Sequence, residues 1–349
     1  MREATRFGPY WLDARLAVGG TAEVYLARPV DAREAPARLI VKRLLPHIMS
    51  DPEGRTMFER EARLHAAVRH DNVVRLHDWG VTAGGEPYLA LEFVDGVDCF
   101  RLLRRLGQDG RNLGIPTATR VAIHVLDALS SVHAATDENG KALGIIHRDV
   151  TPSNVFLSKR GDVKLGDFGI ARAATARATI RNGDGPVIKG KYAYLAPEQV
   201  GGDAFDHRAD VFALACVLVE MILGRPLFSG SGQLAVLLAI RDCRLDPLIE
   251  AKASLPAGMF EVLERGLARE PAGRFESAAA FAAALEPFAD TKEAARSSLA
   301  EEVFLIQTNP SASSMAAVRE SMRALRTASG QRPAVVEERV LEPVAATPA

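Results

Sequence analysis

The sequence predicts an α+β protein in which strands come early in the chain and helices make up most of the rest. Two β-rich runs joined by a Gly-containing turn lie between Tyr10 and Arg28, the pattern of a hairpin. Leu39 to Lys42 and Tyr88 to Gly96 are apolar and short, as expected of buried strands. From Thr117 to Ala135 the apolar residues recur at helical spacing.

Composition limits the classes of partner. The chain has 349 residues, which suits one large domain or two ordinary ones. Charged residues make up 25% and the formal net charge is −1, so nothing indicates nucleic acid or an anionic membrane as a partner. The most apolar run, Val211 to Leu223, contains Glu220 and is shorter than the about 18 residues of a membrane span. We expect a buried core helix there and no membrane span.

The cysteines and the N-terminal residues bear on the compartment. Cys99, Cys216 and Cys243 are scattered and odd in number, which argues against a disulfide framework or a zinc site. Such usage is typical of a reducing compartment. Residues 1–10 lack the apolar stretch of a signal peptide. We therefore expect a cytoplasmic protein.

An amphipathic helix is predicted between Asp51 and Val68. Phe58, Ala62 and His65 share one stripe, and Glu61 lies close to it. Glu59 lies about 160° around the helix from Glu61 at 100° per residue, so only one of the two carboxylates can face inward. The spacing of His65 from the later histidines fits no single helix or strand face, so we expect no metal site among them.

The stretch from His147 to Gly169 carries the chemistry. Asp149 and Asn154 precede a short apolar strand, a polar turn follows, and a second short strand ends just before Asp167. A hairpin would bring these three side chains to one edge. Phosphoryl transfer needs such a set, because one carboxylate orients the attacking hydroxyl while a carboxylate and an amide hold magnesium on the phosphates.

This stretch resembles the catalytic and metal-binding loops of the eukaryotic-type protein kinases, with His147-Arg148-Asp149 and Asp167-Phe168-Gly169 in the family's order. Further landmarks follow in that order: Ala196-Pro197-Glu198, Asp210, and Arg274 as the ion-pair partner of Glu198. The resemblance covers about Tyr10 to Phe288. On it, the chain is identified as a bacterial eukaryotic-like (Hanks-type) serine/threonine protein kinase.

The resemblance implies a two-lobed protein kinase fold, with ATP bound between a small β-rich N-lobe and a larger helical C-lobe. The kinase domain would span residues 10–289, with the N-lobe at about 10–93 and the C-lobe at about 94–289. The tail, 290–349, is expected to be helical over 291–305 and 315–328 and disordered at its end.

The resemblance also implies roles for individual residues. Asp149 would orient the substrate hydroxyl, while Asn154 and Asp167 would hold Mg²⁺. Lys42, fixed by Glu61, would align the phosphates of ATP. Residues implied to contact the nucleotide come from the Gly-rich loop, the interlobe hinge and the pocket floor: Ala17, Val18, Gly19, Gly20, Val24, Lys42, Glu92, Phe93, Val94 and Leu157. The implied partners are a protein substrate, which the sequence does not identify, and a second copy for autophosphorylation.

The chain departs from the family pattern in two places. Ala17 and Ala22 replace two of the three glycines of the Gly-rich loop, which would weaken nucleotide binding if either methyl approached the phosphates. Thr151 stands where the catalytic loop usually has a lysine, and Lys191 stands where a threonine is usual. One hypothesis is that Lys191 supplies the missing cation, with Thr151 as its hydrogen-bond partner. The alternative is an exposed Lys191 and reduced activity.

Regulation is expected in the segment from Ala171 to Lys189, the place of the activation loop. Arg148, beside the catalytic Asp149, is the position that often pairs with a phosphorylated residue in this family, and a phosphate adds about −1.5 to −2 charge for it to bind. Thr175 and Thr179 are the candidates.

Two other functions are consistent with parts of this pattern. A pseudokinase scaffold that binds nucleotide without transfer is favoured by Ala17, Ala22 and Thr151, while the five polar residues of the chemistry argue against it. A small-molecule phosphotransferase shares the His-x-Asp loop, but Asp210 and Arg274 belong to a platform for protein substrates and argue against it.

Overall fold

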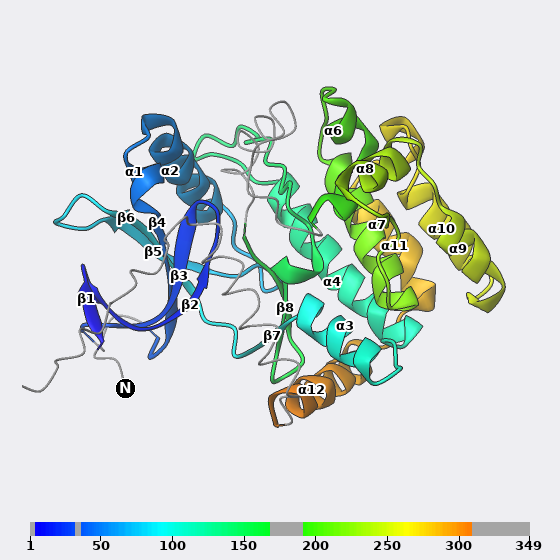
Figure 1. Ribbon diagram of the computed structural model, residues 1–349, viewed down its shortest axis with the longest axis horizontal. Coiled ribbons are helices and arrows are strands. Elements are labelled where there is room, and N and C mark those ends of the chain that lie inside the picture. The colour runs from blue at the N-terminus through cyan, green and yellow to red at the C-terminus, as the bar shows by residue number, and fades with distance from the viewer. Residues whose placement is uncertain (1–3, 32–35, 168–190, 309–349) are drawn as a thin grey trace, which may run out of the picture. The chain divides into compact units, whose positions relative to one another are not determined.

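The computed structural model describes residues 4–31, 36–167 and 191–308. The first part of the chain forms an antiparallel sheet in the order β1-β2-β3-β4-β6-β5 (Figure 1). Its strands are β1 Thr5–Phe7, β2 Tyr10–Val18, β3 Ala22–Pro29, β4 Leu39–Leu44, β5 Leu76–Val81 and β6 Pro87–Glu92. The predicted hairpin between Tyr10 and Arg28 is therefore confirmed as β2 and β3.

Helix α2, Pro52–Ala66, follows the short helix α1, Pro46–Met49, and packs on β5 and β6. Asp51 caps α2 by accepting a hydrogen bond from the Glu53 amide, and Pro52 occupies the first turn, where no amide hydrogen is needed. The buried face is Phe58, Glu61, Ala62 and His65. The predicted stripe is thus confirmed.

The rest of the described chain is mainly helical. The helices are α3 Cys99–Gln108, α4 Ile115–His133, α6 Pro197–Gly201, α7 Arg208–Leu223, α8 Gln233–Arg241, α9 Asp246–Ala251, α10 Met259–Gly266, α11 Ala278–Leu285 and α12 Lys292–Thr308. Short 3-10 turns lie at Pro152–Asn154, Lys191–Tyr194, Lys252–Ser254, Pro271–Gly273 and Glu286–Phe288. Nearly every side chain of α7 is buried, which confirms the predicted core helix.

A second sheet joins β7 Gly96–Asp98, β8 Val155–Ser158 and β9 Val163–Leu165 in that order, all antiparallel. Its last two strands are the hairpin predicted after Asn154. Leu165 also links this sheet to the chain after α2, because its amide donates to Asn72 O at 2.7 Å and its carbonyl accepts from the Val74 amide at 2.8 Å. The hairpin is therefore held by β7 on one side and by the chain after α2 on the other.

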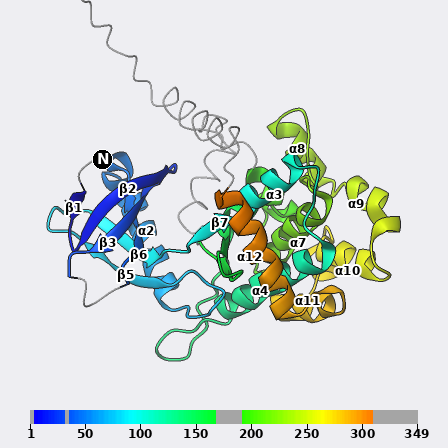
Figure 2. The same ribbon diagram turned by 90° about the horizontal axis from the view of Figure 1, so that it is seen from below.

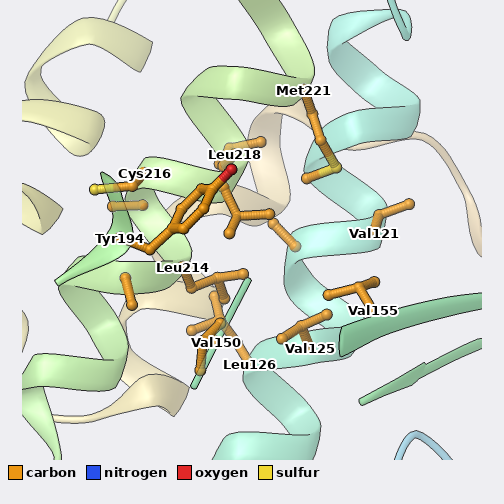
Figure 3. Close-up of a cluster of buried hydrophobic side chains, with 14 of the residues drawn as sticks. Val121, Val125, Leu126, Val150, Val155, Tyr194, Leu214, Cys216, Leu218 and Met221 are labelled. Atoms are coloured by element: carbon orange, nitrogen blue, oxygen red, sulfur yellow. The ribbon is translucent and has the colours of Figure 1, made fainter. Parts of the chain in front are cut away.

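A large hydrophobic core supports the loop between α4 and β8. Figure 3 shows Val150 beside Leu126 of α4 and Leu214 of α7, and Val155 beside Val125 of α4. Val150 is 1% exposed and Val155 is 0% exposed. The loop that carries Asp149 and Asn154 is thus anchored by a buried valine within it and a second one directly after it.

The predicted α+β, two-lobed kinase fold is confirmed by this architecture. Among the helices that the structure describes, none has the length and apolar character that crossing a membrane requires. Residues 171–189, with Thr175 and Thr179, and the predicted helix at 315–328 lie outside the described residues.

Candidate active site

Lys42 lies at the centre of the site. It sits on β4, opposite Leu89 of β6, and its Nζ is 2.9 Å from Glu61 Oε1 and 3.2 Å from Asp167 Oδ1. The ion pair between Lys42 and Glu61, expected from the sequence, is therefore present. Glu59 points elsewhere on α2, where it pairs with Arg55 at 3.3 Å.

The charge state of Lys42 follows from its surroundings. Burial by itself lowers the pKa of Lys42, but the negative charges of Asp167 and Glu61 outweigh burial and leave that pKa above its ordinary value. The ammonium group is therefore positive at neutral pH. A buried cation between two carboxylates is well placed to bind phosphate oxygens.

Asp210, in the first turn of α7, holds the loop that carries Asp149. Its Oδ2 accepts hydrogen bonds from the His147 amide and from His133 Nε2, both at 2.8 Å, and its Oδ1 accepts from the Arg148 amide at 2.8 Å. Arg148 has a positive φ of 69°. Such a conformation is strained for a residue with a side chain, so the bonds from Asp210 offset its cost and fix the position of Asp149.

Asp210 is itself kept ionised. Burial raises the pKa of Asp210, but the hydrogen bond and the charge from His133 outweigh burial, so the pKa lies below its ordinary value. The carboxylate can then accept from two backbone amides at once, as found.

Asn154 and Asp149 form one unit at the start of β8. Asn154 is 3% exposed, and its Nδ2 donates to the carbonyl oxygen of Asp149 at 2.7 Å and to Asp149 Oδ2 at 2.8 Å. With both amide hydrogens used in this way, Asn154 keeps its Oδ1 as an oxygen ligand. The Asp149 carboxylate is thereby held in a fixed position relative to Asn154.

Oxygen ligands for a divalent cation are present at this edge of the hairpin. Asp167 follows β9 with a positive φ of 55°, and 46% of its side chain is exposed. Its carboxylate and Oδ1 of Asn154 are the ligand types that Mg²⁺ prefers. The donor set therefore fits the magnesium that a kinase site requires, and Asn154 and Asp167 would hold it.

The structure places the residues of the predicted Gly-rich loop in two different environments. Gly19 closes the β2–β3 turn, with its amide donating to Ala22 O at 2.8 Å. Ala17 is exposed, whereas Ala22 is 3% exposed and pairs with Leu44 of β4. Of the two alanines that replace glycines, Ala17 is thus the one that can meet a ligand. A Cβ at Gly20 would meet no protein atom within 4 Å, so the space beside Gly20 is open for a ligand.

The predicted hinge follows β6. The Glu92 carboxylate accepts from the Arg75 amide at 3.1 Å and pairs with Lys164 of β9 at 2.9 Å, which ties the hinge to the hairpin. Phe93 and Val94 are half-buried. Val94 packs against the apolar cluster of α2, β4 and β6, so this segment borders the N-lobe core.

Leu157, which the resemblance implies as a nucleotide contact, lies away from the site. Its side chain is 0% exposed and belongs to the C-lobe core, so its assignment to the nucleotide site is wrong. Its neighbour Phe156 is partly buried and packs on the N-lobe cluster that includes Val94. Successive residues of a strand face opposite sides, and this alternation on β8 was the signal that could have identified Phe156.

The exchange of residue types at positions 151 and 191 is described only in part. Thr151 is 3% exposed, and its hydroxyl is 3.0 Å from Ser153 Oγ. Thr151 borders a small cavity with Asp149, Tyr194 and Gln199. Lys191 opens the 3-10 turn Lys191–Tyr194, but its side chain lies outside the described part of the chain. Its pairing with Thr151 therefore stays a prediction.

The predicted ion pair between Glu198 and Arg274 is confirmed. Arg274 Nη1 and Nη2 each lie 2.7 Å from one carboxylate oxygen of Glu198, and the side chains are 0% and 7% exposed. Arg274 also donates to the carbonyl oxygens of Ala268, Arg208 and Arg269. A buried pair needs such additional bonds to offset the loss of hydration.

The comparisons with known proteins agree with this geometry. The model of the protein kinase domain family matches residues 10–285. The tyrosine-protein kinase MasK of Myxococcus xanthus is 39% identical over 282 residues, covering 81% of this chain and 43% of MasK. The serine/threonine-protein kinase PknB of Mycobacterium tuberculosis is 36% identical over 276 residues, covering 77% of this chain and 41% of PknB. The chain thus spans less than half the length of these relatives.

A solved structure shows the same fold. The PknI kinase domain of Mycobacterium tuberculosis superposes with a TM-score of 0.58 at 29% sequence identity, covering 83% of this chain and 99% of that one.

Proposed function

Because the chain belongs to the protein kinase family, we propose that it transfers the γ-phosphoryl group of ATP to serine or threonine hydroxyls of proteins, with Mg²⁺. One observation carries the proposal. Lys42 bridges Glu61 of α2 and Asp167 after β9, so a phosphate-binding cation and a metal-binding carboxylate are brought together from the two lobes. Phosphoryl transfer depends on such positioning more than on covalent chemistry.

In this proposal each polar residue has one role. Lys42 binds phosphate oxygens and is held by Glu61. The Asp149 carboxylate, fixed by Asn154, accepts the proton of the attacking hydroxyl or orients it. Magnesium, when held by Asn154 and Asp167, neutralises charge on the phosphates. Gly19, Gly20 and the exposed Ala17 cover the nucleotide, while Phe156 takes the place first given to Leu157 below the base.

We further propose that Lys191 supplies the cation that Thr151 cannot. Thr151 borders the same cavity as Tyr194, which belongs to the turn that begins at Lys191. This proximity supports a cation that comes from that turn instead of from position 151. A second positive charge near the transferred group would stabilise the charge that develops there.

Autophosphorylation of Thr175 or Thr179 completes the proposal. Support comes from Arg148, whose guanidinium lies 5.4 Å from the centre of the Phe205 ring while its backbone is bound by Asp210. An arginine held in this way beside Asp149 could pair with a phosphate and report on the state of the loop.

One comparison favours tyrosine, instead of serine or threonine, as the residue that receives the phosphoryl group. PknB is named as a serine/threonine-protein kinase, whereas MasK, at 39% identity, is named as a tyrosine-protein kinase. The test is phosphoamino-acid analysis after reaction of the purified chain with γ-labelled ATP and Mg²⁺. Phosphoserine or phosphothreonine supports the proposal, and phosphotyrosine alone would overturn that part of it.

The same sample separates a kinase from a nucleotide-binding scaffold. A kinase incorporates label. A scaffold incorporates none, although ATP with Mg²⁺ still raises its melting temperature.

A further inference from the structure

Helix α12 lies beyond the residues that the kinase family model matches, which end at 285. Figure 2 shows it crossing α3 and α4 beside β7. Ala295, Leu299 and Val303 form its buried stripe, and each is at most 1% exposed. Leu299 and Val303 belong to the same core cluster as Val155 and Leu165 of the hairpin. The helix is therefore packed into the lobe that carries the candidate metal ligands.

The contact with the hairpin is made at the turn between β8 and β9. Arg296 Nε donates to Arg160 O at 2.9 Å, and its Nη2 lies 3.0 Å from Asp162 Oδ1. Gly161 has a positive φ of 78°, and a Cβ on it would lie 1.9 Å from Arg296 O. The turn and the α12 backbone thus touch directly, so this position requires glycine.

The same turn is braced internally and toward the hinge. Ser158 Oγ donates to Asp162 Oδ2 and accepts from the amides of Arg160 and Asp162. The Lys159 amide donates to Asp95 O at 2.8 Å, and its Nζ lies 3.0 Å from Asp95 Oδ2. A movement of the turn would therefore be transmitted to the strands of the hairpin and to the chain after the hinge.

Asn154 and Asp167 lie at the other end of this hairpin. Its strands are short, Val155–Ser158 and Val163–Leu165, and short hairpins depend on packing for their order. We propose that α12 is a brace for the metal-binding hairpin, and that Arg296 is a positioning residue that holds Asn154 and Asp167 at the separation magnesium needs. This inference rests on the proposed function for its kinetic consequence only.

The structure supplies matched controls. Arg111 pairs with Glu302 of α12 and so touches the same helix away from the turn. Gly140 has the same φ of 78° as Gly161, but a Cβ on it would meet nothing within 4 Å. Replacement of either glycine by alanine imposes the same backbone strain, and only Gly161→Ala collides with α12.

The test uses the full chain with Arg296→Ala, Gly161→Ala, Arg111→Ala and Gly140→Ala. Amide hydrogen exchange over residues 158–167 is measured without nucleotide or metal, and the Mg²⁺ concentration for half-maximal phosphoryl transfer is measured separately. We expect Arg296→Ala to raise both the exchange rate and this concentration by about two- to fivefold, the range for one exposed ion pair. The value of kcat at saturating Mg²⁺ should be unchanged. Gly161→Ala should raise the exchange rate and the half-maximal Mg²⁺ concentration more than Gly140→Ala does.

Two results of the exchange measurement would overturn the brace. One is hairpin exchange in Arg296→Ala equal to that of the wild type. The other is Gly161→Ala matching Gly140→Ala, which would mean that contact with α12 has no effect on the hairpin. A fall in melting temperature shared by Arg296→Ala and Arg111→Ala, with unchanged Mg²⁺ dependence, would likewise assign α12 a merely structural role. If the wild type transfers no phosphate, the proposed function fails, while the exchange comparison still decides the brace.

Discussion

Asn154 donates both of its amide hydrogens to Asp149, one to the backbone carbonyl at 2.7 Å and one to the carboxylate at 2.8 Å. One residue thus fixes the carboxylate that we propose meets the substrate hydroxyl, and it keeps one oxygen for the proposed metal. The two tasks cannot be separated by any substitution that removes the amide.

Replacement of Asn154 by alanine should therefore lower kcat by about 10²–10³, the usual effect of removing one positioned polar group. The Mg²⁺ concentration for half-maximal activity should rise in the same variant. Titration of activity against Mg²⁺ checks both. Asn139→Ala, an exposed asparagine in the loop after α4, is the control and should change neither. A kcat near that of the wild type for Asn154→Ala would contradict the assignment.

The pair between Lys42 and Glu61 should affect activity and stability in different ways. Lys42→Met should remove the cation proposed to bind phosphate oxygens, and it leaves Glu61, whose side chain is 4% exposed, as a buried charge without Lys42. We expect a loss of about 3 kcal/mol in the free energy of unfolding. The double variant Lys42→Met, Glu61→Leu should recover most of that stability and none of the activity. Urea unfolding and ATP turnover measure the two effects.

A control for this pair lies on the same helix. Glu59 and Arg55 form an exposed pair, with 34% and 43% of their side chains accessible. Glu59→Gln should change the free energy of unfolding by less than about 1 kcal/mol. If Lys42→Met were no more destabilising than Glu59→Gln, the buried pair would not be a structural element.

The exchange at positions 151 and 191 makes a sharp prediction. If Lys191 supplies the cation, Lys191→Ala should lower kcat by about 10²–10³. The double variant Thr151→Lys, Lys191→Thr, which restores the usual family arrangement, should recover activity relative to Lys191→Ala. Steady-state kinetics on all variants provides the comparison. Turnover of Lys191→Ala close to the wild-type value would show that the compensation does not occur.

His65 should make stability depend on pH. Burial lowers the pKa of His65 from 6.5 to about 4, and a hydrogen bond between its Nε2 and Val74 O, 2.7 Å apart, opposes burial only in part. The unfolded chain then binds a proton between pH 6.5 and 4 that the folded chain does not, so stability falls as the pH is lowered through this window. The loss at pH 5 relative to pH 7.5 is about 2 kcal/mol from this residue.

The measurement is the free energy of unfolding at both pH values for the wild type and for His65→Gln. Glutamine can still donate to Val74 O but does not titrate, so the variant should lose about 2 kcal/mol less than the wild type on acidification. Equal losses in the two proteins would show that His65 is not the titrating group.

The fold and most of the site could be predicted because their signals are local. The residue order around Asp149 and Asp167 predicts a hairpin with polar ends, and β8 and β9 form that hairpin. The helical angle between Glu59 and Glu61 leaves one inward carboxylate, and Glu61 is the buried one. Each of these needs only the periodicity of one element.

The parts that could not be predicted depend on pairing between distant segments. Ala22 is buried because it lies opposite Leu44 on β4, a register that no local pattern sets. The predicted role of Leu157 was wrong because the choice between Leu157 and Phe156 depends on which face of β8 meets the C-lobe core. The contact of Arg296 with the β8–β9 turn joins residues 136 positions apart in the chain.

The most direct test of the proposed kinase activity is transfer of label from γ-labelled ATP, with Mg²⁺, by the purified wild-type chain and by Asp149→Asn. We expect label on protein in the wild type and none in the variant, because asparagine cannot accept the proton of the attacking hydroxyl. Equal labelling of both proteins, or none in the wild type while ATP still raises its melting temperature, would contradict the proposed activity.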